Sequence, residues 1–167
     1  MTVFVCGISR TGKTSLIKRR NSFELGFSYV SASEVLRSLG LPVLNLSIQD
    51  ALSNQRAICN SIERQIPNKL IVDGHLLIET NEGPFLVPVT HLLGWNIRLI
   101  VFVSDSVNLI SERRGITGKR FALDEIGLLS EIEFSYAKYV ALKIGAKFEM
   151  LSSQDTEAFH QLIESEY

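Results

Sequence analysis

Residues 7–14 combine two glycines, a lysine and a threonine at the spacing of a phosphate-binding loop. Their sequence, GISRTGKT, matches the pattern G-x-x-x-x-G-K-[S/T] at every fixed position: Gly7, Gly12, Lys13 and Thr14. In such a loop the backbone N–H groups converge on an anion, the lysine ammonium lies against the β- and γ-phosphates, and the hydroxyl binds Mg²⁺. We expect a bound nucleotide also to contact Ser9, Arg10 and Thr11 of the loop and Ser15, the residue after it.

The residues on either side of this loop have the order that its chemistry requires. The apolar run TVFVC at residues 2–6 is typical of a strand, and TSLIK at residues 14–18 is typical of a helix. A strand, a loop and a helix in this order direct the loop amides and the helix N-terminus toward one anion. A glycine-rich turn that binds nothing is the alternative interpretation. The flanking elements favour the binding of ATP with Mg²⁺.

A second candidate lies in the segment LIVDG at residues 70–74. An acidic residue at the carboxyl end of a buried strand is how phosphate-loop proteins hold the Mg²⁺ shell, and Asp73 has this position. The alternative is a turn, because Asp-Gly is a common turn pair. Gly74 would let a substrate approach closely. His75 could contact a phosphoryl oxygen or a base, or it could be structural.

A third candidate is the basic segment at residues 111–120, where Gly115 and Gly118 interrupt the predicted helix. A mobile segment rich in arginine is how phosphoryl-transfer enzymes close over a triphosphate, and one well-placed arginine contributes about 10³–10⁵ in rate. A solvated surface turn is the alternative. If the segment is a lid, it brings these cations to the γ-phosphate: Arg113, Arg114 and Arg120.

Short β-rich runs alternate with longer helical repeats along the chain, which is typical of an α/β protein. We expect strands at residues 2–6, 27–30, 69–72, 97–103 and 147–151. We expect helices from residue 14, from residue 31 to near 40, and at 47–66, 104–114, 123–144 and 156–163. Residues 75–80 and 85–89 flank a turn and predict a small hairpin. The sequence therefore predicts one domain over residues 1–167, a three-layer phosphate-loop NTPase fold with a mostly parallel five-stranded sheet, a short lid and a hairpin insertion.

The composition narrows the range of partners. A chain of 167 residues with 46% apolar and 21% charged residues is ordinary for one globular domain. Its net charge of −1 argues against DNA or RNA as the main partner. Cys6 and Cys59 lack metal-ligand spacing and are expected to be buried thiols in a reducing compartment. We expect no signal peptide, no membrane span and a cytoplasmic location.

In their order along the chain, these motifs resemble the nucleoside-monophosphate-kinase branch of P-loop proteins. The segment YVSASEVLR at 29–37 is similar to the start of the monophosphate-binding helix of adenylate kinases. The segment IVDGH at 71–75, with the hairpin, resembles archaeal-type adenylate kinases, and ERRG at 112–115 resembles the lid of the small nuclear adenylate-kinase-like NTPases. The resemblance implies that Arg37 grips the acceptor phosphate and that these residues also contact the acceptor: Ser31, Gly74 and His75.

The chain departs from this pattern at three places. Arg10 stands where the family loop usually has a second glycine, and Leu76-Leu77 stand where the common adenylate kinases have an arginine. Phe134 stands where archaeal-type enzymes have another arginine.

We therefore interpret the chain as an ATP- and Mg²⁺-dependent kinase of a nucleoside monophosphate or a similar small acceptor, with Lys13 and Asp73 as central catalytic residues. Two alternatives stay open. One is a slow ATPase or nucleotide-dependent switch that acts on a protein or RNA partner, and the other is a kinase of a non-nucleotide small molecule.

Overall fold

The computed structural model describes residues 1–19, 25–63, 68–115 and 122–165. Its centre is a five-stranded sheet in the order β2-β3-β1-β6-β7, and every neighbouring pair of strands is parallel. The strands are β1 (Thr2–Cys6), β2 (Ser28–Ser31), β3 (Leu70–Asp73), β6 (Ile97–Val103) and β7 (Lys147–Leu151). The predicted α/β fold with a parallel sheet is confirmed.

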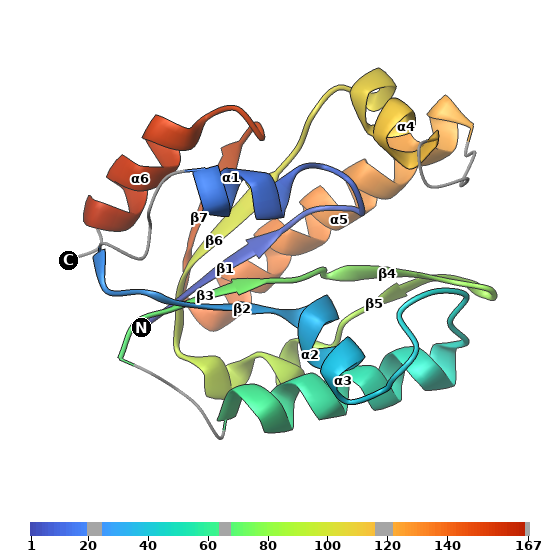
Figure 1. The fold of residues 1–167 in the computed structure, drawn as a ribbon, viewed down its shortest axis with the longest axis horizontal. Coiled ribbons are helices and arrows are strands. Elements are labelled where there is room, and N and C mark those ends of the chain that lie inside the picture. The colour runs from blue at the N-terminus through green and yellow to red at the C-terminus, as the bar shows by residue number, and fades with distance from the viewer. Residues whose placement is uncertain (20–24, 64–67, 116–121, 166–167) are drawn as a thin grey trace.

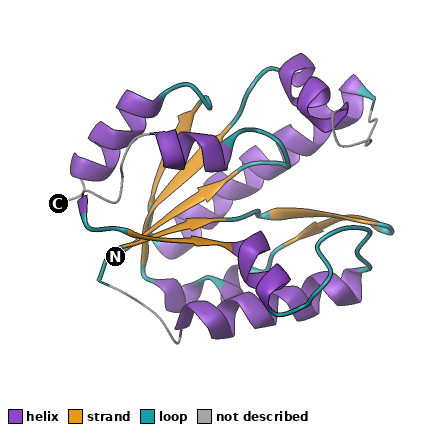
Figure 2. Ribbon diagram, viewed as in Figure 1, coloured by secondary structure: helices purple, strands orange, loops and turns teal. Residues whose placement is uncertain are grey.

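Helices cover both faces of the sheet and make the three layers (Figure 1). Helices α1 (Lys13–Arg19) and α6 (Thr156–Ser165) pack on one face through a cluster that includes Leu16, Val5 and Phe159. Helices α3 (Ile48–Glu63) and α5 (Leu123–Ile144) pack on the other face (Figure 2). Because both faces are covered, β1 and β3 are buried at every residue, which explains their unbroken apolar sequences.

Two further helices and a hairpin lie beside the carboxyl ends of the strands. Helix α2 (Ala32–Ser38) follows β2 directly, and α4 (Val107–Gly115) follows β6. Strands β4 (Leu77–Thr80) and β5 (Gly83–Leu86) form the predicted antiparallel hairpin (Figure 1). Its turn is tighter than predicted, because the Thr80 hydroxyl donates to the Gly83 carbonyl oxygen at 2.6 Å and closes it.

The start of α4 and two short turns also differ from the sequence prediction. Helix α4 begins at Val107 and not at residue 104, because the Ser106 hydroxyl accepts the Leu109 N–H (3.3 Å) and caps the helix there. Two short 3₁₀ turns, η2 (Val89–His91) and η3 (Leu93–Trp95), follow the hairpin and were not predicted. No helix within the described residues is long and apolar enough to cross a membrane.

The strand order determines where a ligand can bind. In the sheet β1 lies between β3 and β6, and the chain passes from β1 to the edge strand β2 before it returns to β3. The loops after β1 and β3 therefore diverge at the carboxyl edge of the sheet, where open α/β sheets bind their ligands. Both Cys6 and Cys59 are buried and free, as predicted, and burial raises the pKa of the Cys6 thiol.

Candidate active site

The loop between β1 and α1 has the backbone shape of a phosphate cradle. Gly7 and Gly12 adopt φ angles of 138° and 94°, which residues other than glycine rarely adopt. A Cβ atom on Gly12 would lie 2.5 Å from the Ser153 Cβ, and one on Gly7 would collide with the Val103 carbonyl oxygen. Both glycines of the motif are therefore required by the fold, because β6 and the segment after β7 pack closely against the loop.

Lys13 is the first residue of α1, and its side chain reaches back to this loop. Its side chain is buried, and the ammonium donates to the carbonyl oxygens of Gly7 at 2.7 Å and Ile8 at 3.2 Å. These acceptors belong to the same loop, so a phosphate oxygen could replace them without a movement of the surrounding helices.

Thr14 and Asp73 meet beside the loop. The Thr14 hydroxyl donates to the Asp73 carboxylate at 2.6 Å, and the Tyr29 hydroxyl donates to the same carboxylate oxygen at 3.1 Å. A hydroxyl and a carboxylate next to a phosphate site fit Mg²⁺, which prefers oxygen ligands and commonly takes only one or two from the protein. Within the described ranges no group of three or more His, Cys, Asp or Glu could hold a metal ion. The sequence prediction did not include Tyr29.

A second residue that the sequence prediction missed is Glu133, on α5. Its side chain is fully buried, and one carboxyl oxygen accepts the N–H groups of Gly7 at 3.2 Å and Leu76 at 2.8 Å. Its other oxygen has no partner among the described residues. Burial raises the pKa of Glu133 to about 7, although the nearby Lys13 ammonium lowers it. Glu133 therefore joins the first amide of the phosphate loop to the segment after β3.

The Glu133→Gln variant is expected to be more stable than the wild type at alkaline pH. The folded protein holds the Glu133 proton with a pKa raised to about 7, whereas the unfolded chain releases it near an ordinary glutamate pKa of about 4.3. The stability that this proton contributes is therefore complete below the unfolded pKa and lost as the pH rises through about 7. Glutamine carries no such charge, so the gain should be roughly 3–4 kcal/mol at about pH 8 and roughly 1 kcal/mol at about pH 5. Urea unfolding at both pH values measures the difference, and parallel pH profiles for the two proteins would contradict the expectation.

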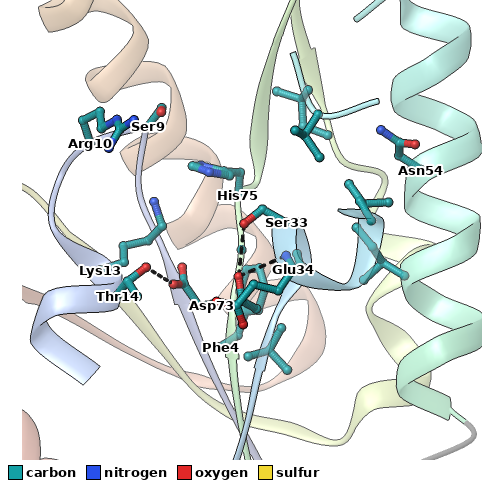
Figure 3. Close-up of a pocket in the computed structure, with 18 of the residues that line it drawn as sticks. Phe4, Ser9, Arg10, Lys13, Thr14, Ser33, Glu34, Asn54, Asp73 and His75 are labelled. Carbon is teal, nitrogen blue, oxygen red and sulfur yellow. Dashed lines mark hydrogen bonds between the residues drawn. The ribbon is translucent and has the colours of Figure 1, made fainter. Parts of the chain in front are cut away.

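The loop forms one wall of a cleft with a volume of about 780 Å³. The opposite wall comes from α2, α3 and the 3₁₀ turns, and it is largely apolar with two amide side chains: Leu36, Val43, Leu46, Asn54, Gln55, Ile58, Leu92 and Trp95. Figure 3 shows Lys13 and Thr14 on one side of the cleft, Asn54 of α3 on the other, and Asp73 between them. The cleft therefore extends well past the phosphate cradle toward a second binding region.

The acceptor residues predicted from the sequence line this cleft, and two of them have structural roles as well. Ser31 caps α2, because its hydroxyl accepts the Glu34 N–H at 3.4 Å. The His75 Nδ1 atom bonds the Gly7 carbonyl oxygen at 2.8 Å, and burial with the nearby Lys13 charge lowers the His75 pKa. Gly74 packs against the Phe4 ring, and a Cβ atom there would lie 3.0 Å from Phe4 Cε2.

The remaining predicted contacts differ in how they face the cleft. Arg37 lines it and is exposed, with its guanidinium donating to the Ser33 hydroxyl at 3.3 Å. The loop residues Ser9, Arg10 and Ser15 also line it. Thr11 does not, because its side chain is buried and its hydroxyl donates to the Ile8 carbonyl oxygen at 3.1 Å.

The two arginines of α4 are held beneath and beside the phosphate loop. Arg114 is buried, pairs with both carboxylate oxygens of Glu79 at 3.0 and 2.6 Å, and donates to the Ser9 carbonyl oxygen at 3.3 Å. It does not line the cleft, so the expectation that Arg114 faces the nucleotide is corrected. Arg113 lines the cleft but is bound to Asp105 at 2.7 Å and to the Arg10 carbonyl oxygen at 3.1 Å. Arg120 lies outside the described residues.

The fold matches that of small P-loop kinases. A shikimate kinase from Acinetobacter baumannii, solved in complex with shikimate, superposes with a TM-score of 0.61 at 14% identity, covering 99% of this chain and 93% of that one. A deoxyadenosine kinase from M. mycoides, with a TM-score of 0.56 at 13% identity, covers 99% and 98%. A sugar kinase from Janibacter sp., with a TM-score of 0.58 at 14% identity, covers 98% and 92%. No protein-family model and no curated protein matches the sequence. The chain thus has the P-loop kinase fold over nearly its whole length.

Proposed function

We propose that this protein is a kinase that transfers the γ-phosphoryl group of ATP to a nucleoside monophosphate. The observation that carries the proposal is the continuity of the cleft, which joins the phosphate cradle to a second wall on α2 and α3. The phosphates of one nucleotide alone would not need this second wall. A switch protein requires a cradle for phosphates but no neighbouring acceptor pocket. A kinase requires both, with the two substrates oriented toward each other.

The loop residues would perform the transfer mainly by positioning and charge neutralisation. The amides of residues 7–14 and the Lys13 ammonium would hold the β- and γ-phosphates. Thr14 and Asp73 would hold Mg²⁺, which supplies charge neutralisation at the phosphates when it is bound. Tyr29 would keep the Asp73 carboxylate in place, since its hydroxyl donates to that group. The half-buried His75, whose pKa is lowered, would stay neutral and would fix the Gly7 carbonyl oxygen.

The acceptor would lie between α2 and α3. Arg37 is the exposed cation of α2 that lines the cleft, which suits a monophosphate dianion. The apolar wall with the Phe4 and Trp95 rings suits a flat base, and the amides of Asn54 and Gln55 could hydrogen-bond to it. An acceptor with no anionic group would leave Arg37 unused, so the arginine favours a monophosphate over neutral small molecules.

The test is an incubation with ATP, Mg²⁺ and each of AMP, CMP, GMP, UMP and their deoxy forms, followed by chromatography of the nucleotides. We expect one acceptor to give a diphosphate. With that acceptor, Arg37→Ala should raise the monophosphate KM by about 10–100-fold, because a charge-assisted hydrogen bond contributes roughly 1.5–3 kcal/mol. The matched control is Arg56→Ala, an exposed arginine of α3 that does not line the cleft.

Two outcomes would contradict the proposal. Release of ADP and phosphate without phosphorylation of any acceptor would favour the ATPase or switch. An unchanged KM in Arg37→Ala, with transfer intact, would place the acceptor phosphate elsewhere and would favour a non-nucleotide acceptor.

A further inference from the structure

The two arginines of α4 are already engaged in the protein, so within the described residues neither is free for the transferring phosphoryl group. Arg114 is buried in its ion pair with Glu79. Arg113 donates both to Asp105, at 2.7 Å, and to the Ser153 hydroxyl, at 3.2 Å. Moving either guanidinium to the nucleotide would leave a largely buried carboxylate without its cation, which is strongly unfavourable.

The guanidinium of Arg10, in contrast, is not held by a carboxylate among the described residues. Arg10 belongs to the phosphate loop, is exposed and lines the cleft, three positions before Lys13. No side chain among the described residues holds its guanidinium, whereas Arg113 holds its backbone through a hydrogen bond of 3.1 Å to the Arg10 carbonyl oxygen. Figure 3 shows Arg10 on the loop and Lys13 at the start of α1, both across the cleft from Asn54. The backbone of Arg10 is therefore fixed while its side chain is available.

The backbone conformation of Arg10 is one that favours glycine. Its φ angle is 74°, in the left-handed region, and the loop's other two residues with positive φ are Gly7 and Gly12. An L-residue with an unbranched but long side chain is strained there, and such strain persists at functional sites when it serves a role. Glycine at this position would give the same loop without strain. The arginine side chain therefore has a use that the loop shape alone does not explain.

We propose that Arg10 is a catalytic residue that contacts the γ-phosphoryl group during transfer, and this inference rests on the proposed kinase function. In the step, an oxygen of the acceptor forms a bond to the γ-phosphorus. The bond from that phosphorus to the β–γ bridging oxygen breaks, and ADP leaves with the electron pair. Arg10 would neutralise the negative charge that spreads over the equatorial oxygens, so the phosphate loop itself supplies the cation.

The test compares wild type, Arg10→Gly and Arg10→Lys, with Arg98→Ala as a control. Arg98 is an exposed arginine near the start of β6, at the opposite edge of the sheet from the loop. We expect Arg10→Gly to melt at a higher temperature than wild type, because the strain is relieved. Its kcat should fall by about 10³, with the affinity for ADP changed by less than about threefold. The kcat of Arg10→Lys should lie between those of wild type and Arg10→Gly, and the kcat of Arg98→Ala should match that of wild type.

The outcomes separate this inference from the proposed function. A kcat of Arg10→Gly close to that of wild type, with transfer intact, overturns the inference and leaves the kinase standing. A loss of both stability and activity in Arg10→Gly overturns it as well, because the residue would then be structural. A large fall of kcat in Arg120→Ala, with none in Arg10→Gly, would assign the contact with the γ-phosphoryl group to Arg120. If wild type phosphorylates no acceptor, the kinase proposal fails, and Arg10 is judged on ATP hydrolysis: a loss in Arg10→Gly supports the contact with the γ-phosphate, and an unchanged rate overturns it.

Discussion

Replacement of Lys13 by alanine is expected to abolish phosphoryl transfer and to leave the fold intact. The ammonium is buried in the loop and donates to two carbonyl oxygens of that loop, at 2.7 and 3.2 Å. A triphosphate would take the place of these acceptors and receive a charge that water cannot screen. Preorganised donors of this kind contribute about 10²–10³ in rate each, so kcat should fall by at least that factor.

Single-turnover transfer from radiolabelled ATP measures this effect, and a thermal melt of each variant shows whether the fold survives. Lys13→Met is the matched control, because it keeps most of the buried aliphatic stem and removes only the charge. We expect it to be as inactive as Lys13→Ala and closer to wild type in stability. Transfer by both variants at a rate within about threefold of wild type would exclude the proposed role of Lys13.

The phosphate loop and the parallel sheet could be predicted from the sequence because both are local signals. The loop motif occupies consecutive residues, and glycine is needed at positions 7 and 12 for a backbone shape that other residues rarely adopt. The unbroken apolar runs of β1 and β3 are likewise explained by the helices on both faces of the sheet. Asp73 follows from the same reasoning, because it ends a buried strand.

Glu133 was missed although the sequence carries a signal for it. The buried residues of α5 recur at helical spacing, and Glu133 occupies one of these positions: Ile126, Leu129, Glu133, Ala137 and Val140. A charged residue on the apolar face of a helix is expected to have a specific partner. Its partner could not have been named, because the Gly7 amide lies 126 positions away along the chain.

The role of Arg114 was also beyond the sequence. Arg114 follows Ile110 by one helical turn, and both are buried on the same face of α4. The sequence indicates a hairpin at Glu79 but does not indicate that this hairpin lies against α4. The basic segment at residues 111–120 therefore resembled a lid in the sequence. In the structure its second arginine, Arg114, lies in the protein interior.

Replacement of Arg114 by methionine is expected to destabilise the protein more than any loss of an exposed ion pair would. The guanidinium is 2% exposed and makes two parallel hydrogen bonds to the Glu79 carboxylate, which is 20% exposed. Without Arg114 this carboxylate stays largely buried and lacks its cation, which costs about 3–5 kcal/mol. For a chain of this length we therefore expect a melting temperature lower by roughly 6–20 °C.

The double variant Arg114→Met with Glu79→Leu separates the charge from the packing. Because an apolar pair of similar volume can replace a buried ion pair with little loss, the double variant should recover most of the stability. Lys18→Met is the matched control, since Lys18 and Glu34 form a pair at 3.8 Å in which both side chains are more than half exposed. It should change the free energy of unfolding by less than about 1 kcal/mol. A double variant that is as unstable as Arg114→Met would show that the ion pair itself is needed.

The activity of the double variant decides what the ion pair does for the site. Arg114 also donates to the Ser9 carbonyl oxygen at 3.3 Å, so it connects the hairpin, α4 and the phosphate loop. If the pair serves only stability, the repaired variant should transfer phosphate at the wild-type rate. If it positions the loop, the repaired variant should fold well and still show a raised KM for ATP, because Ser9 has lost its donor. We expect the second result, since methionine cannot donate to the loop.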